Sequence, residues 1–355
     1  AEAEALLRRA ARGRAARLGE GHEDTLVAAA NLAEVLRCLG RPDEARQMCQ
    51  AARSGLAGLL GDAHPRTMDC TFCLARLLAA NQEYVAAEPM FAKVSIWREQ
   101  RYGSENLDTL SSVMSLADLR QNVGRLEEAV ALVKWVHERL VKSLGRENPE
   151  TLKCSNNWAC MLEELGKPKE AQELYQEVYD ALQERLGPDD PETLTAANGL
   201  ASVLEAQGKV GEAEALYRRV LEGFEARLGA AHPDTLGSMY NLAALLQESG
   251  KASEAEDIFR RELLGCEQAH GLDHEVTLGS VRNLAQILQQ RGNLVEAELL
   301  FRRELAGWEA LSNGPDGEEA LKAAVRSRHS LEALLGQCLA DAGADANATS
   351  GTDVN

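Results

Sequence analysis

Apolar residues recur along the chain at the spacing of helices that bury one face. Between residues 233 and 250 they recur at three- and four-residue steps, as from Met239 to Leu242 and Ala243, and the set is Leu236, Met239, Leu242, Ala243 and Leu246. This spacing places them on one side of an amphipathic helix. A short polar turn follows, and "SEAEDIFRREL" then opens a second helix that is expected to run to Gly271. The pattern therefore predicts a pair of helices.

Residues typical of helix ends mark the limits of both helices. In "HPDTL", His232 stands where a cap belongs, Pro233 takes a first helical position, and Asp234 adds an anion where the helix dipole favours one. Gly250 follows the first helix and Gly271 follows the second, as expected for residues that end helices.

The helix pair repeats with a constant period of 42 residues. Threonine marks the period at 25, 67, 109, 151, 193, 235 and 277, and alanine marks it at 45, 87, 129, 171, 213, 255 and 297. One glycine series runs through 19, 61, 103, 145, 187, 229 and 271, and a second runs through 40, 124, 166, 208, 250 and 292. Gln82 replaces one member of the second series, and Asn313 takes the next position of the first, where its tolerance of the left-handed conformation is expected to be used.

A single helical pair cannot cover its own apolar face, so neighbouring pairs must stack and bury that face between them. We therefore predict an all-α solenoid. The recurring alanine is expected where the paired helices approach most closely, because a larger side chain there would overpack the contact.

The stretch "NLAALLQESGKASEA", which begins at Asn241, resembles the tetratricopeptide repeat. The usual period of that repeat is 34 residues. The 42-residue form, with "HPDTL" at its head and "LG" at its tail, is similar to the repeats of kinesin light chains and to the partner-sensing arrays of some nucleotide-binding signalling proteins. The resemblance implies a right-handed superhelical solenoid of antiparallel helix pairs.

The solenoid is expected to cover residues 1–312, as a trailing half-repeat over 1–20 followed by seven complete repeats. The opening "LLRRAARGRAARLG" aligns with "LYRRVLEGFEARLG" from Leu216, so we interpret it as the second helix of a repeat whose first helix is missing, in an excerpt of a longer protein. Residues 313–340 are predicted to form a degenerate capping helix region. Residues 341–355 are small and polar and are predicted to be a disordered tail.

Composition and charge narrow the function classes. The formal net charge of −18 argues against a nucleic-acid surface, which needs a clustered basic stripe. No apolar run has the length that a membrane-spanning helix requires, so no membrane contact is expected. Eight cysteines scattered over helix positions are typical of a reducing compartment, which predicts a cytoplasmic protein.

Cys70 and Cys73 form a Cys-x-x-Cys pair, which could be half of a zinc site or a redox pair. No second pair or matching histidine spacing accompanies them, so buried or groove-lining thiols are the favoured interpretation. Neither a metal site nor a cofactor is predicted.

Four histidines share one position of the repeat, which Asn or Asp fills elsewhere: His22, His64, His232 and His274, with Asn106, Asn148 and Asp190. Residues that interchange in this way are typical of helix caps, and a role as pH sensors is the alternative. The chain contains no glycine-rich phosphate loop, no Gly-x-Ser-x-Gly elbow and no metal-binding histidine pair on one helix face. We therefore predict that it is not an enzyme.

The face of the first helices that does not pack is rich in amides, and we call it the amide stripe. Asparagine returns there at 31, 157, 241 and 283, although it is a mediocre helix former. An amide both donates and accepts, so a ladder of amides can hold the backbone of an extended peptide whatever its sequence. The resemblance places this stripe on the concave wall, where kinesin light chains bind cargo peptides. The candidate groove residues are Asn31, Lys153, Asn156, Asn157, Asn198, Tyr240, Asn241, Arg282, Asn283 and Gln286.

The alternative is that each amide bonds to the neighbouring helix and tightens the stack. Cys73, Ser115 and Gly199 interrupt the ladder, which favours a site between the fourth and seventh repeats. Carboxylates offset the basic residues of the stripe, so its slightly acidic lining suits a neutral or basic peptide.

The leading hypothesis is a non-enzymatic scaffold that binds a peptide segment of a partner protein, as in a kinesin-light-chain-like cargo adaptor. The heptad repeats that join those proteins to the motor are absent from this sequence. Two alternatives stay open: the sensing or regulatory arm of a larger signalling protein with a nucleotide-binding domain, and a self-associating structural solenoid. We expect a monomer, with end-to-end association through the N-terminal edge as the other possibility.

Overall fold

The computed structural model of the chain describes residues 2–314 and 317–350. The first helices of the pairs are α2 (Glu23–Cys38), α4 (Pro65–Ala80), α6 (Leu107–Asn122), α8 (Pro149–Glu164), α10 (Pro191–Ala206), α12 (Pro233–Glu248) and α14 (Glu275–Gln290). The second helices are α3 (Pro42–Leu60), α5 (Tyr84–Tyr102), α7 (Leu126–Leu144), α9 (Pro168–Leu186), α11 (Val210–Leu228), α13 (Ala252–His270) and α15 (Leu294–Leu311). Helix α1 (Glu2–Leu18) precedes the first pair, and α16 (Gly317–Ser350) follows the last.

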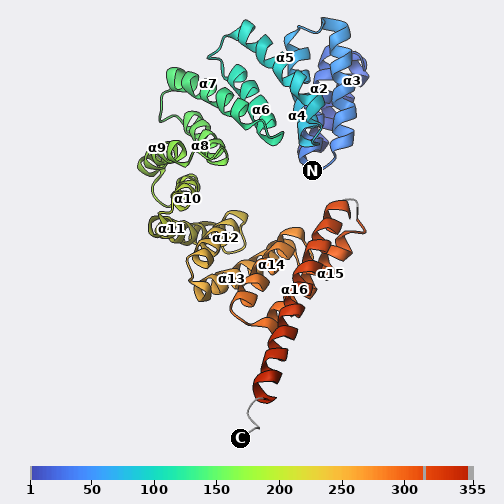
Figure 1. Ribbon diagram of the computed structural model, residues 1–355. Coiled ribbons are helices and arrows are strands. Elements are labelled where there is room, and N and C mark those ends of the chain that lie inside the picture. The colour runs from blue at the N-terminus through green and yellow to red at the C-terminus, as the bar shows by residue number, and fades with distance from the viewer. Residues whose placement is uncertain (1, 315–316, 351–355) are drawn as a thin grey trace. The chain divides into compact units, whose positions relative to one another are not determined.

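The chain divides into two compact units, residues 1–174 and 175–355. Within each unit, successive helices pack together, as α2 does on α3 and α12 on α13, and form helical hairpins joined by short turns (Figure 1). The described residues contain helices and turns without a strand. The prediction of an all-α solenoid of helix pairs is therefore confirmed.

The predicted caps hold the first helices at their N-termini. His22, His64, His232 and His274 each accept a hydrogen bond at Nδ1 from the backbone N–H two residues further on, over 3.2–3.3 Å. The side chains of Asn106, Asn148 and Asp190 accept the equivalent bond. The interpretation of this position as a helix cap is confirmed, because histidine, asparagine and aspartate all supply an acceptor for an otherwise unpaired N–H.

Glycines end the second helices in a backbone conformation that L-residues avoid. Their φ angles lie near +90°, as at Gly229 with φ 87° and Gly271 with φ 93°. At the turn inside each pair, Gln82 carries φ 62° where the other repeats have glycine, and it is the non-glycine residue with positive φ within the described range. The expectation that Asn313 uses this conformation is wrong. There α15 ends at Leu311, Ser312 continues in a helical conformation, Asn313 has no positive φ, and Gly314 donates its N–H to the Leu311 carbonyl.

The recurring alanine lies at the packed contact between paired helices. Each member of the series has no exposed surface: Ala45, Ala87, Ala129, Ala171, Ala213, Ala255 and Ala297. Ala129 on α7 belongs to one buried cluster with Leu110, Val113 and Ala117 of α6. The methyl group therefore sets how closely the two helices of each pair approach.

Helix α16 packs on α15. Its Ala320, Ala323, Ala324 and Leu334 are buried, which is how a helix covers the last apolar face of a stack. The predicted boundary at residue 340 falls inside this helix, and residues 351–355 of the predicted tail lie outside the described residues. None of the described helices combines the length and apolar character that crossing a bilayer requires.

Replacing Gln82 with glycine should stabilise the protein, because Gln82 holds a left-handed conformation that costs an L-residue about 1 kcal/mol. We expect the free energy of unfolding, measured by urea denaturation of the chain, to rise by about 1 kcal/mol.

The matched control is Gly124→Gln, which places glutamine at the equivalent turn with φ 81°. It should lower the free energy of unfolding by a similar amount. A stabilising Gly124→Gln substitution would contradict the strain assigned to Gln82.

Candidate functional site

The predicted groove residues are distributed over both units. Asn31 lies on α2, and Lys153, Asn156 and Asn157 lie on α8, all in the first unit. Asn198 lies on α10, Tyr240 and Asn241 on α12, and Arg282, Asn283 and Gln286 on α14, all in the second unit. Each of these ten side chains is exposed or half-buried.

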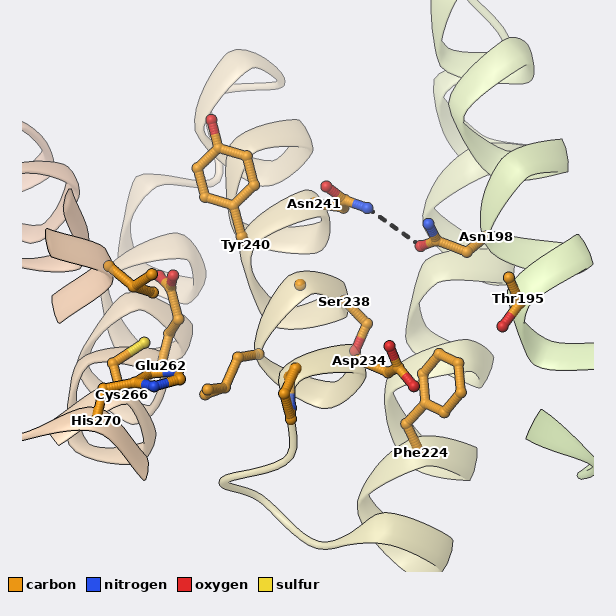
Figure 2. Close-up of a pocket in the computed structure, with 14 residues that line it drawn as sticks. Thr195, Asn198, Phe224, Asp234, Ser238, Tyr240, Asn241, Glu262, Cys266 and His270 are labelled. Atoms are coloured by element: carbon orange, nitrogen blue, oxygen red, sulfur yellow. Dashed lines mark hydrogen bonds between the residues drawn. The ribbon is translucent and has the colours of Figure 1, made fainter. Parts of the chain in front are cut away.

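A cavity of about 540 Å³ in the second unit brings three of these residues together: Asn198, Tyr240 and Asn241. Figure 2 shows Asn198 on one side of α12 and Glu262 with Cys266 on the other. The cavity contacts α12 at Gly237, where a Cβ would meet no atom within 4 Å. Mid-helix glycine costs about 1 kcal/mol relative to alanine, and here it keeps the cavity open.

Some amides of the stripe form hydrogen bonds to a neighbouring helix, and others form none to the described residues. Asn241 donates from Nδ2 to Asn198 Oδ1 over 3.2 Å (Figure 2), and Gln247 donates to Gln290 over 2.8 Å. Each bond joins neighbouring first helices, as the stack-tightening alternative predicts. Asn31, Asn157 and Asn283 make no side-chain hydrogen bond to any described residue. These three amides are therefore available to a ligand.

Gly199 interrupts the asparagine series for a steric reason. A Cβ at this position would lie 2.4 Å from Cε1 of Tyr175, which is below the closest approach of two carbon atoms. Tyr175 is buried at 4% exposure, so its ring cannot move aside without disturbing the core. A side chain at residue 199 is therefore excluded by packing.

Arg282 forms an ion pair with a buried carboxylate, Glu304, in its own repeat. It donates from Nε to Oε1 of Glu304 over 2.6 Å, and Glu304 on α15 has no exposed surface. Its Nη2 lies 3.5 Å from Ser327 Oγ on α16. Because the guanidinium neutralises a buried carboxylate, Arg282 contributes to packing as well as to the stripe.

Sequence reasoning missed Glu262 on α13, which lines the same cavity and is 6% exposed. The Ser280 hydroxyl donates to its Oε1 over 3.0 Å, and its Oε2 has no partner among the described residues. Burial raises the pKa of Glu262 to about 7, and the bond from Ser280 acts in the opposite direction. The sequence did indicate that position 262 is unusual, since valine fills the equivalent position of four earlier repeats, at 94, 136, 178 and 220.

The structure describes the surroundings of the Cys-x-x-Cys pair, and within the described residues no group of three or more His, Cys, Asp or Glu side chains could hold a metal ion. Cys70 is buried, and its Sγ lies 3.9 Å from Sγ of Cys49 rather than against Cys73. Burial raises the pKa of Cys73 to about 11, so this thiol is protonated and unreactive near neutral pH.

Replacing Glu262 with glutamine should remove a pH-dependent loss of stability. The pKa of this carboxyl rises from 4.5 to about 7 on folding, so its contribution to stability is complete below pH 4.5 and is lost as the pH rises to 7. The difference corresponds to about 3 kcal/mol. We expect Glu262→Gln to match the wild type near pH 4 and to exceed it by up to about 3 kcal/mol near pH 8 in urea denaturation.

Glu248→Gln, which changes an exposed carboxylate on α12, is the control and should alter stability little at either pH. The other titratable groups around the cavity, Asp234, Cys266 and His270, are the same in all three proteins. Equal pH profiles for Glu262→Gln and the wild type would contradict the burial argument.

Comparison with known proteins agrees with this architecture. A sequence model of the tetratricopeptide repeat matches residues 24–94, 109–184, 154–226, 192–263 and 234–310. No curated protein matched the chain.

Solved structures share the fold. A putative kinesin light chain of Podosopora anserina with nearly identical repeats is 27% identical, with a TM-score of 0.53 over 58% of this chain and 97% of that one. A tetratricopeptide repeat protein from Parabacteroides merdae is 14% identical, with a TM-score of 0.57 over 86% of this chain and 98% of the other. A signal transduction ATPase with a tetratricopeptide repeat sensor from Pyrococcus horikoshii is 13% identical, with a TM-score of 0.60 over 81% of this chain and 43% of that chain. Because the repeat model matches most of the sequence and these structures share its helix pairs, the chain belongs to the tetratricopeptide repeat family.

Proposed function

We propose that this protein is a non-enzymatic scaffold that binds an extended peptide segment of a partner along the amide stripe of its second unit. The observation that carries the proposal is the cavity of about 540 Å³ lined by Asn198, Tyr240 and Asn241. These residues come from two successive first helices, so a peptide that crosses the repeats would contact each in turn.

The chemistry of the stripe supports binding to a peptide backbone. The bond between Asn241 and Asn198 leaves the Asn198 amide group and the Asn241 carbonyl oxygen without another partner among the described residues. Asn283 adds a free amide on α14. Backbone N–H and C=O groups need both an acceptor and a donor, and amides supply both.

Tyr240 supports the same proposal. Its ring is 46% exposed and lies 6.4 Å from the buried Phe259 ring, measured between centroids. An aromatic side chain that is fixed on one side and exposed on the other presents a rigid apolar surface, which is a common anchor in protein interfaces.

A kinesin-light-chain-like cargo adaptor is the setting we favour, because the similarity to the putative kinesin light chain of Podosopora anserina reaches 27% identity. The sensing arm of a larger signalling protein remains the second setting, and the likeness to the ATPase sensor at 13% identity supports it only through the shared fold. In both settings we propose a cytoplasmic, monomeric array whose partner is a protein.

Asn283→Ala separates binding from stacking, because this amide makes no hydrogen bond to the described residues. Alanine favours helix by about 0.6 kcal/mol over asparagine, so stability should stay the same or rise slightly. Peptides selected from a random display library on the wild-type chain should bind Asn283→Ala about tenfold more weakly in fluorescence anisotropy, as expected for loss of a hydrogen bond worth about 1 to 1.5 kcal/mol.

Gln268→Ala, which removes an exposed amide from α13 outside the cavity, is the matched control and should bind the same peptides with unchanged affinity. Equal affinities for the wild type, Asn283→Ala and Asn241→Ala would overturn the site. If Asn241→Ala lowers the melting temperature while Asn283→Ala leaves affinity intact, the amides serve the stack.

A further inference from the structure

The repeat frame shows that the fold does not need a carboxylate at the position of Glu262. Four earlier repeats carry valine there: Val94, Val136, Val178 and Val220. None of these valines is more than 1% exposed. An apolar side chain therefore fills this interface without difficulty, and a buried carboxylate adds a desolvation cost that the valine repeats avoid.

The seventh repeat also has glutamate in place of this valine, and there an arginine pairs with it. Glu304 occupies the position equivalent to Glu262 and is fully buried. Arg282, 22 residues before it, donates from Nε to its Oε1 over 2.6 Å. The guanidinium therefore offsets the cost of burying the carboxylate.

The sixth repeat lacks that cation. The residue 22 positions before Glu262 is Tyr240, which cannot neutralise a carboxylate. Glu262 Oε1 accepts a hydrogen bond from the Ser280 hydroxyl, and Glu262 Oε2 has no hydrogen-bond partner among the described residues. A nine-tenths buried carboxylate is thus left without the arginine that its counterpart possesses.

Space is available where the missing cation would lie. Glu262 and Tyr240 both line the cavity of about 540 Å³, together with Gly237, which leaves its side of the cavity unfilled. The remaining titratable groups at the cavity are Asp234, Cys266 and His270. Figure 2 shows Glu262 beside Cys266 on α13, on the same side of α12 as Tyr240, and both Glu262 and Tyr240 line the cavity.

We propose that the cavity takes an arginine side chain of the bound peptide, whose guanidinium pairs with Glu262 as Arg282 pairs with Glu304. This inference rests on the proposed function and specifies its ligand as a peptide with arginine at one position. The ligand's guanidinium would also stack on the Tyr240 ring, which favours arginine over lysine. The amides of Asn198 and Asn241 would hold the backbone next to it.

The test uses the full chain and a degenerate peptide library in which one position is fixed in turn as arginine, lysine, citrulline, leucine or glutamate. Citrulline has the shape of arginine without its charge. We expect arginine to be preferred at one position, and Glu262→Gln to weaken binding of that peptide about 30-fold or more, because a buried charge pair loses one partner. Glu248→Gln, on the exposed face of α12, is the control and should leave the preference intact.

Two further variants guard against a folding defect. Glu262→Val copies the earlier repeats, so it should be at least as stable as the wild type at neutral pH and should show no arginine preference. Tyr240→Arg copies the seventh repeat, so its own guanidinium should fill the cavity and lower the affinity for the arginine peptide.

The outcomes distinguish this inference from the proposed function. If Asn283→Ala weakens peptide binding while arginine and citrulline peptides bind alike, the peptide groove stands and the arginine pocket is overturned. Equal preference for lysine overturns the guanidinium assignment. Failure of every peptide pool to bind overturns both proposals.

Discussion

The structure depends on one packing constraint, which is that each helical pair has an apolar face that only the next pair can cover. The fully buried alanine of each repeat, from Ala45 to Ala297, keeps the two helices of a pair close enough for their larger side chains to meet those of the neighbour. Stability is therefore shared between adjacent repeats rather than held in one central core. The constraint also explains why α16 packs its alanines on α15.

The repeats share one packing arrangement, so a residue that differs from its equivalents in the other repeats stands out. A buried carboxylate in place of valine carries a desolvation cost. Glu304 departs from the buried valine of earlier repeats, and Arg282 neutralises it. Glu262 departs in the same way, but Tyr240 takes the place of the arginine. Burial raises the pKa of Glu262 to about 7, because the ionised carboxylate lacks a cation in this environment. A ligand cation is the simplest physical means of offsetting the desolvation cost.

The amide stripe places one residue type in two environments, one hydrogen-bonded within the stack and one without a side-chain partner among the described residues. Asn241 bonds to Asn198 across the repeat boundary, and this bond orients the two amides in the cavity. Asn283 and Asn157 make no such bond to the described residues. A rigid pair beside free amides is a suitable arrangement for an extended peptide, since ligand groups then pair with side chains that are already ordered.

The sequence alone determined the helices, their caps and their order, because these depend on local chemistry that repeats every 42 residues. It also predicted that Asn198, Tyr240 and Asn241 lie on the unpacked face of first helices, and these three residues line one cavity. The environment of Glu262 was decided by tertiary structure, since its burial and the unpaired Oε2 atom depend on α12 and α14, which pack against α13. The same holds for Arg282, whose partner lies on α15, and for Gly199, whose side-chain space is taken by Tyr175. Periodicity determines which face of a helix is buried, but only packing between helices determines whether a charge on that face finds a partner.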